Sequence, residues 1–488
     1  MRILLVNPPY GDSVVGFERL MVIEPLALEY LGKILKKEGH TVKIFDAVLD
    51  KKYVQTVKKF HPDVISFTCI YAHIYVIDKM CKQAKSIYPD IKTIAAGSHA
   101  VLFPHEFFLD SVDIVNSGED LLVAPKLMRG IEANDLSDVE GIYYRTEHGW
   151  QKGKPATRCI SIDELPFPDR TLTKKYRKNY YWYFEREIAA VWGSVGCPFK
   201  CYYCTQWSKN GGRFVARSPE SLIAEIKELE QDAVFIIDDN TFLNEARVRR
   251  IIELIKENNI HKKYMCYCSA NLVIKHQDIL REWKQYGLAK LMIGFEGVRK
   301  KDLNDVSQKT ALETNTEAIR ILHEIGIDTM AGFIIYPDFT VEDFKTLRRY
   351  VRENGIYYVE YTSLTPFPGT RFYDESKAKL SSYNPELYDM QHQLLETTLP
   401  LKEYYKQVAL TYLTTYLPHR SFTCKVNFKL SLNPFHPMYR SFARFVWKNY
   451  TAYKDHEREV KPLKTDSYTL PHPAENERTC RYAKAGNH

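Results

Sequence analysis

The 488-residue chain contains no apolar run of the roughly 18 residues that a membrane-spanning helix needs. Its first segment, Met1–Pro9, is too short for a signal peptide and ends in a turn. Its ten cysteines show no disulfide framework, which favours a reducing compartment. The composition, with 45% hydrophobic and 26% charged residues, is that of a soluble globular protein. These features predict a cytoplasmic protein of about three domains.

Acidic residues are scarce in the last part of the chain. Residues 401–488 hold 15 Lys and Arg against 7 Asp and Glu, a net charge of +8. The whole chain carries +7, so the first 400 residues sum to −1. No nucleic-acid-binding motif accompanies the basic excess, and RNA binding is therefore the weakest interpretation of it.

Within this basic part, Pro437–Tyr453 has the pattern of an amphipathic helix. One interpretation is a helix that lies at a membrane surface and gives peripheral contact with a lipid bilayer. The other is a helix that packs its apolar side on the protein. The apolar side carries Tyr439, Phe442, Val446 and Tyr450, and the basic side carries Arg440, Arg444 and Lys448.

Cys197, Cys201 and Cys204 lie within nine residues of one another. A structural zinc site needs four ligands, commonly a C-x2-C pair with a second pair downstream. The nearby Cys266 and Cys268 are separated by one residue and fit a strand better. Cysteine thiolates are the usual ligands of iron–sulfur clusters. Three thiolates on one loop can hold three irons of a cubane and leave the fourth iron open.

This spacing, with Tyr203 before the last cysteine, resembles the signature of the radical S-adenosylmethionine (SAM) superfamily. The resemblance implies a 4Fe-4S cluster whose open iron binds SAM, and an external electron donor of the flavodoxin or ferredoxin type. An electron from the cluster then cleaves SAM to a 5′-deoxyadenosyl radical. A non-enzyme alternative is an iron–sulfur protein that only senses or transfers electrons. Acidic strand ends at Asp238, Asp239 and Glu296 argue against that alternative.

Alternating strand and helix patterns predict an α/β fold. Residues 1–140 are expected to form a doubly wound, Rossmann-like domain, and residues 141–185 a linker. Residues 186–375 suit a partial (β/α)6 barrel, and residues 376–488 a mainly helical, basic region. Ligands of both α/β domains are expected at the carboxyl ends of the strands.

The N-terminal domain resembles the cobalamin-binding domain that precedes many radical SAM domains. The resemblance rests on Pro25–Leu28, Asp63–Thr68 and Ala96–Ala100. Val48 stands where a D-x-H-x-x-G motif would have histidine, so cobalamin would have no histidine ligand on its lower face. The alternative is a domain that binds no cofactor. The candidate contacts at the strand ends are Asn7, Pro8, Asp46, Ser66, Thr68, Gly97, Ser98, His99 and Glu119.

The resemblance also implies SAM contacts in the barrel. Tyr203 is expected near the adenine. Asp238 and Asp239 end the second strand, where a carboxylate would pair with the SAM ammonium. The same residues also suit a turn or a helix N-cap.

Two later strand ends complete this set. Glu296 is expected to accept the ribose hydroxyls of SAM, with a buried ion pair as the competing account. Gly332–Pro337 matches only part of a G-x-I-x-G-x-P pattern, because Tyr336 replaces the second glycine. Gly332 and Thr365, the latter in the closing turn Thr365–Thr370, are the remaining candidate contacts.

The segments Ile293–Val298, Tyr336–Thr340 and Leu364–Thr370 look most like the hopanoid C-3 methylase group. The anaerobic magnesium-protoporphyrin monomethyl ester cyclases are a looser match. The implied function is methylation of an unactivated carbon of an apolar small molecule or isoprenoid lipid. The 5′-deoxyadenosyl radical would abstract hydrogen, and methylcobalamin would supply the methyl group. A radical cyclase or another C–C or C–O bond-forming enzyme with the same cofactors is the alternative.

Overall fold

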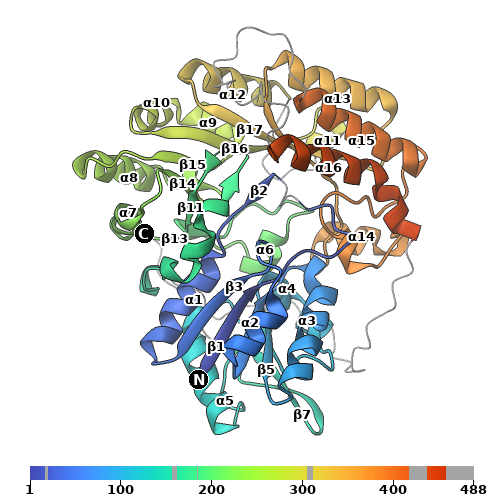
Figure 1. Cartoon of the computed structure of the whole chain (residues 1–488). Helices are drawn as coiled ribbons and strands as arrows, with labels where there is room; N and C mark the ends of the chain where they lie inside the picture. The colour runs from blue at the N-terminus through green and yellow to red at the C-terminus, as the bar shows by residue number, and fades with distance from the viewer. Residues whose placement is uncertain (17–19, 157–161, 184, 305–311, 417–436, 458–488) are drawn as a thin grey trace. The chain divides into compact units, whose positions relative to one another are not determined.

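The computed structural model describes the chain apart from residues 17–19, 157–161, 184, 305–311, 417–436 and 458–488 (Figure 1). The described residues divide into two compact units. The N-terminal unit contains Met1–Asp12 and Glu24–Lys178, and the barrel unit contains Ser13–Ile23 and Asn179 onward. The domain boundaries expected from the sequence remain a prediction.

The N-terminal unit is built on a seven-stranded sheet of order β3-β1-β4-β5-β6-β7-β8. The first five strands in this order are parallel, and β7 and β8 join antiparallel. Both antiparallel strands come from the stretch expected to be a linker. The bounds are β1 Arg2–Asn7, β3 Thr41–Asp46, β4 Val64–Thr68, β5 Lys92–Ala96, β6 Ile114–Asn116, β7 Ile142–Thr146 and β8 Gly149–Lys152.

Helices cover both faces of this sheet, which confirms the doubly wound fold. Leu4 and Val6 of β1 face the core under α2 and α3, whereas Ile3 and Leu5 face the core under α1 and α5. This alternation follows from the two-residue period of a strand. The helices are α1 Leu26–Lys37, α2 Tyr53–Phe60, α3 Ile74–Ile87, α4 Ser98–Leu102 and α5 Ala124–Ala133.

The barrel unit contains a six-stranded parallel sheet of order β11-β14-β15-β16-β17-β18. This open half-barrel confirms the predicted (β/α)6 architecture (Figure 1). Its strands are β11 Ile188–Val191, β14 Ala233–Ile236, β15 Lys263–Cys268, β16 Leu288–Glu296, β17 Asp328–Ile335 and β18 Tyr358–Ser363. Its helices include α7 Pro219–Glu228, α8 Glu245–Glu257, α9 Ala270–Lys275, α10 Gln277–Gln285, α11 Lys300–Asn304, α12 Leu312–Ile325 and α13 Val341–Glu353.

A small antiparallel sheet, with β2 Met21–Val22, β9 Tyr181–Trp182 and β10 Glu185–Arg186, belongs to the same unit. Trp182 from this sheet stacks on Phe235 of β14, with ring centroids 4.6 Å apart. Phe235 in turn contacts Tyr267 of β15, and Tyr183 contacts Tyr358 of β18. We call these five rings the aromatic floor. They lie on the inner face of the sheet, below the carboxyl ends of its strands.

The outer strand β18 would leave backbone groups unpaired at the edge of the sheet. Helix α15, Leu401–Tyr416, supplies hydroxyl groups to them. The Tyr412 hydroxyl donates to the carbonyl of Tyr361 and accepts from its N–H, at 2.6 and 3.2 Å. Tyr416 forms the same pair of bonds with Val359, at 2.8 and 3.0 Å. Two side chains therefore replace a missing strand.

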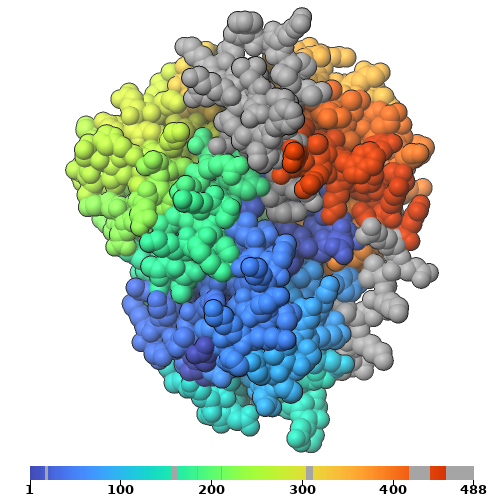
Figure 2. All heavy atoms as spheres, in the orientation of Figure 1, coloured from blue at the N-terminus to red at the C-terminus, as the bar shows by residue number. Residues whose placement is uncertain are grey.

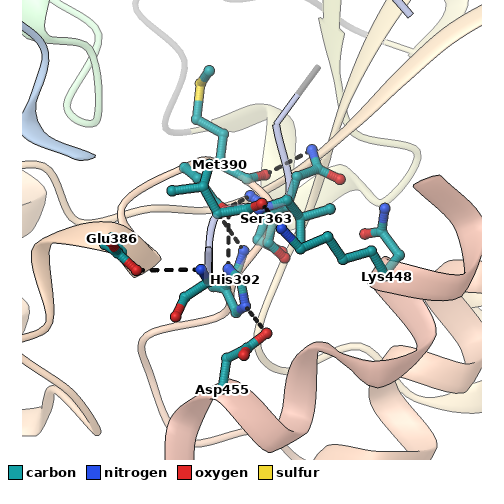
Figure 3. A network of polar contacts seen from close by, with 12 residues as sticks. Ser363, Glu386, Met390, His392, Lys448 and Asp455 are labelled. Atoms are coloured by element: carbon teal, nitrogen blue, oxygen red, sulfur yellow. Dashed lines mark hydrogen bonds and ion pairs between the residues drawn. The ribbon is translucent and has the colours of Figure 1, made fainter. Parts of the chain in front are cut away.

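The segment after β18 is fixed by a buried charged network (Figure 3). The ring of His392 lies 2.9 Å from Asp389 and 3.5 Å from Asp455, which follows helix α16, Pro437–Thr451. Asp389 also accepts a hydrogen bond from the N–H of Val15 at 2.6 Å. Lys448 of α16 donates to the carbonyl of Val14. The network thus joins three segments far apart in the sequence.

The predicted amphipathic helix is present as α16. Phe442 and Phe445 pack on Tyr416 and Tyr412 of α15, with ring centroids 5.1 and 4.9 Å apart. The apolar side of α16 is therefore used in packing within the unit, as the second interpretation of its pattern expected. By contrast, Trp447 of the same helix has 65% of its surface exposed. The red-orange surface of this region is visible in the space-filling view (Figure 2).

Candidate active site

The cysteine loop leaves the sheet at the carboxyl end of β11 and is anchored by two acidic residues. Asp238 accepts hydrogen bonds from the N–H groups of Gly193 and Ser194, at 2.8 and 2.6 Å. Asp239 accepts from the N–H of Gly196 at 2.7 Å. Both carboxylates come from the end of β14, so neighbouring strand ends position the loop before its first cysteine.

The surroundings of Asp238 fit this role as an anchor of the loop. Only 1% of its surface is exposed, and Arg247 of α8 lies 3.9 Å from it. Arg247 also donates to the carbonyls of Gly193 and Arg217, at 2.7 and 2.9 Å. A Cβ at Gly193 would lie 2.9 Å from both carboxylate oxygens of Asp238, so only glycine fits there. Between the two predicted partners of the SAM ammonium, the half-buried Asp239 is the more accessible.

The loop itself brings the three thiols close to one another. All three cysteines are partly exposed. Burial raises the pKa of Cys204 to about 12, and the charges of Cys201 and Cys197 add to that effect. The peptide N–H groups of Phe199 and Gln206 act in the opposite direction, through hydrogen bonds to Cys197 and Cys204. Hydrogen bonds to sulfur are typical of iron–sulfur ligands, and the residues present fit such a cluster.

A zinc site has different requirements. Among the described residues, no three His, Cys, Asp or Glu side chains are arranged to hold a single metal ion. A cubane does not need such convergence, because each cysteine binds its own iron. Cys266 and Cys268 lie buried in β15, the strand location expected from their spacing.

Tyr203 and Glu296, predicted to contact the adenine and the ribose of SAM, are brought together by the fold. The Tyr203 hydroxyl donates a hydrogen bond to the Glu296 carboxylate. Burial raises the pKa of Glu296 to about 7, and the bond from Tyr203 acts against this rise. Glu296 therefore has a tyrosine as its hydrogen-bond partner instead of the cation that a buried ion pair would require.

The backbone around Glu296 explains its placement. Glu296 ends β16 with φ +65°, beside a register shift between β16 and β17. A Cβ at Gly294 would lie 2.5 Å from Glu296 Oε1, so the carboxylate folds back over this glycine. A bulkier residue at position 294 would displace it.

The other two predicted SAM contacts differ in accessibility. Gly332 of β17 lies beside Gly294, and a Cβ on it would contact only backbone atoms, 3.7 Å away. No side chain therefore lies within 4 Å of that Cβ position. Thr365 is buried, and its hydroxyl donates to the carbonyl of Ser363 at 2.9 Å. Tyr336, the departure from the glycine pattern, donates to the carbonyl of Asp302.

The turn after Thr365 contacts the cysteine loop. Ser208 of α6, Thr205–Asn210, donates to the carbonyl of Gly369. The N–H of Phe372 in α14, Arg371–Ser376, donates to the carbonyl of Tyr202 at 3.0 Å. First and last strand ends of the half-barrel are thereby joined beside the cysteines.

In the N-terminal unit, the predicted contacts gather at the carboxyl edge of the sheet. Asn7 donates to Asp46 at 3.1 Å, so the ends of β1 and β3 are joined. Gly97 after β5 has φ +118°, and a Cβ there would lie 2.7 Å from the backbone of Cys69, which excludes other residues. Ser98 is exposed, Thr68, Pro8 and Glu119 flank the edge, and Ser66 is buried. This edge has small residues and polar groups that fit a nucleotide-like tail.

His99 has a local partner. Its Nε2 lies 2.5 Å from Glu106, and its ring packs edge-on against Tyr71. Two features escaped sequence reasoning altogether, namely the anchoring role of Arg247 and a buried acid, Glu360, on β18. A glutamate between Val359 and Tyr361 in a predicted strand was the available signal for the second.

Two family models match this chain. The radical SAM superfamily model covers residues 193–351, and the B12 binding domain model covers residues 13–126. The chain therefore contains a radical SAM domain and a B12-binding domain, and it is a radical SAM enzyme. These domains imply a 4Fe-4S cluster, SAM and cobalamin as its cofactors.

Among curated proteins, the chain is 27% identical to a hopanoid C-3 methylase of Methylococcus capsulatus, over 94% of this chain and 90% of that protein. It is 25% identical to an anaerobic magnesium-protoporphyrin IX monomethyl ester cyclase of Rubrivivax gelatinosus, over 80% of this chain and 72% of that one. The relatives that the chain resembles thus include a methylase and a cyclase.

The fold is similar to a solved structure of OxsB, a cobalamin-dependent SAM radical enzyme with aqua-cobalamin and SAM bound. The TM-score is 0.64 at 16% identity, over 84% of this chain and 66% of that chain. Within the described residues, none of the helices has the length and apolar character that crossing a membrane requires.

Proposed function

We propose that this enzyme methylates an unactivated carbon of an apolar substrate, with an isoprenoid lipid as the preferred class. The observation that carries the proposal is the meeting of Tyr203 and Glu296 beside the cysteine loop, at the strand ends of a half-barrel. The similarity to a hopanoid C-3 methylase over nearly the whole chain supports the substrate class.

Each element of the site has a task in this function. Cys197, Cys201 and Cys204 would hold the cluster, and Glu296 and Asp239 would orient SAM through its ribose and ammonium groups. When bound, the cofactors supply the electron, the radical and the methyl group, which are the difficult steps. The protein positions the reactants and excludes water. The aromatic floor serves the second task, because it closes the lower part of the inner face with apolar rings.

The products of SAM test this function directly. Anaerobically reconstituted protein is incubated with SAM, cobalamin, a reductant or a flavodoxin, and a hopanoid or other isoprenoid lipid. A methyltransferase forms S-adenosylhomocysteine together with 5′-deoxyadenosine, because one SAM donates a methyl group and another generates the radical. Absence of both products from protein that contains its cluster would overturn the proposal.

A radical cyclase is the second candidate, and the similarity to the cyclase of Rubrivivax gelatinosus favours it. This candidate needs the radical but no methyl donor. It therefore predicts 5′-deoxyadenosine without stoichiometric S-adenosylhomocysteine. The ratio of the two products in one incubation separates the candidates.

A lipid substrate also gives a reason for peripheral membrane contact by a cytoplasmic enzyme. Helix α16 presents the exposed side chains of Trp447, Arg440 and Arg444. Aromatic and basic side chains on one surface favour an anionic bilayer. We expect the protein to sediment with phosphatidylglycerol vesicles and the Trp447→Ser variant to do so less. Equal sedimentation of the two would count against this contact.

A further inference from the structure

Strand β18 carries a buried carboxylate that the proposed function leaves unused. Glu360 has only 6% of its surface exposed, and its Oε1 atom has no hydrogen-bond partner among the described residues. Burial alone raises the pKa of Glu360 to about 7. A buried polar group without a partner costs free energy in the folded protein. Such a group needs an explanation that packing does not provide.

The register of the sheet shows which way Glu360 faces. Tyr361 and its neighbour Phe333 stack with ring centroids 6.4 Å apart, and Phe333 contacts Tyr350 of helix α13. These rings therefore lie on the outer, helix-covered face. Successive residues of a strand point to opposite faces. Glu360 and its partner across the strands, Gly332, consequently lie on the inner face of the half-barrel.

The two strands beside Glu360 carry glycines on the inner face of the sheet. In the register of the sheet, Glu360 follows Gly332 and Gly294 in one row across three strands. A Cβ on Gly332 would meet only the backbone of β16 at 3.7 Å. The carboxylate thus follows two glycines in this row, positions that carry no side chain of their own.

This stretch lies between the predicted SAM contacts and the aromatic floor. Glu360 is two residues beyond Tyr358 of the floor, toward the strand ends that carry Glu296. The charges of both Glu360 and Asp239 act on the hydroxyl of Tyr267, raising its pKa further after burial. Glu360 and Asp239, which anchors the cysteine loop, are therefore both within electrostatic range of the Tyr267 side chain.

We propose that Glu360 accepts a hydrogen bond from a hydroxyl or ammonium group of the substrate, and thereby orients the substrate under SAM. The inference rests on the proposed function and narrows its substrate class from an apolar skeleton to one that carries a hydrogen-bond donor. An isoprenoid alcohol or amine satisfies both requirements, with its chain on the aromatic floor and its polar end at Glu360.

The first test needs no substrate. Removing an unpartnered buried carboxylate removes its desolvation cost, so Glu360→Leu should raise the Tm of the full-length protein by about 2 °C or more. Glu353→Gln, at an exposed position of α13, is the control and should leave Tm unchanged. A lower Tm in Glu360→Leu would show that the carboxylate stabilises the fold, and an unchanged Tm would show that its burial costs nothing; either result overturns the proposal.

The second test uses three probes of one skeleton: geranylgeraniol, geranylgeranylamine and geranylgeranyl methyl ether. The reconstituted wild-type protein should form 5′-deoxyadenosine at least about tenfold faster with the alcohol or the amine than with the ether, since a buried acceptor rejects an analogue without a donor. The alcohol and the amine distinguish the two donor groups. Glu360→Leu should lose this preference, and Glu353→Gln should keep it.

Equal rates with all three probes, or an unchanged preference in Glu360→Leu, would overturn the assignment of Glu360. Failure of the proposed function has a different signature. In that case the wild-type protein, with its cluster and reductant, would form no S-adenosylhomocysteine alongside 5′-deoxyadenosine with any probe.

Discussion

Replacing His392 should remove a pH-dependent part of the stability of the barrel unit. Burial by itself lowers the pKa of this histidine, but the carboxylates of Asp389 and Asp455 outweigh burial and raise the pKa to about 9. The ordinary value is 6.5. The difference corresponds to about 3 kcal/mol in the free energy of unfolding, at about 1.4 kcal/mol for each pH unit.

The sign of the effect follows from proton binding. Below pH 6.5 the ring is protonated in both the folded and the unfolded chain, and the full contribution is present. Between pH 6.5 and about 9 the unfolded chain releases its proton while the folded chain keeps it, so stability falls as the pH rises. The neighbouring His456, whose pKa is lowered to about 4 by burial, is neutral throughout this range.

Urea unfolding of the full-length wild type and of His392→Gln, followed by tryptophan fluorescence at pH 6.5, 7.5 and 9, measures this contribution. The difference in unfolding free energy between the two proteins should be largest at pH 6.5 and shrink by about 3 kcal/mol at pH 9. Asp455→Asn, which keeps the histidine but removes one partner, should shrink the pH dependence in part. A difference that stays constant across the three pH values would refute the reasoning.

Four further outcomes follow from the site and the sheet edge. Cys201→Ala should lose most of its iron and form no 5′-deoxyadenosine, as measured by iron analysis and chromatography. SAM binding, measured by equilibrium dialysis, should strengthen as the pH rises through about 7, because Glu296 ionises there, and Glu296→Gln should weaken binding and flatten that dependence. Gly332→Val should reduce 5′-deoxyadenosine formation at least about tenfold while Tm changes little, since its side chain enters open space. Tyr412→Phe should lower the unfolding free energy by about 1–3 kcal/mol in urea titrations, because it leaves the N–H of Tyr361 without its acceptor, whereas the Tyr361 carbonyl keeps the hydrogen bond from Gln391.

The sequence was most informative about strand ends. The alternation of strand and helix patterns predicted the half-barrel, and parallel strands bring their carboxyl ends to one edge. The proximity of Cys204, Tyr203 and Glu296 follows from that rule. The antiparallel strands β7 and β8 fall in residues 141–185, which the sequence predicted as a linker; strands this short give little periodic signal.

Tertiary roles were beyond the reach of the sequence. Asp238 and Arg247 lie 45 and 54 positions from Gly193, and no local pattern links them. From the sequence, Asp238 and Asp239 are equally good candidates for pairing with the SAM ammonium. The fold buries Asp238 and leaves Asp239 more accessible. The hydroxyls of Tyr412 and Tyr416 at the edge of β18 were equally invisible, since tyrosine in a helix usually indicates packing.

The buried carboxylates of the barrel unit differ in how far neighbouring protein groups offset the free-energy cost of their burial. Asp238 receives two peptide N–H groups on Oδ1, and its Oδ2, which has no hydrogen-bond partner among the described residues, lies 3.9 Å from the Arg247 guanidinium, so protein groups alone face this carboxylate. Glu296 receives one tyrosine hydroxyl, and Glu360 has an oxygen without a partner. Because uncompensated burial opposes folding, a carboxylate is retained in such a place when something outside the protein completes its bonding. This order points away from Asp238 and toward Glu296 and Glu360 as the groups that meet SAM and the substrate.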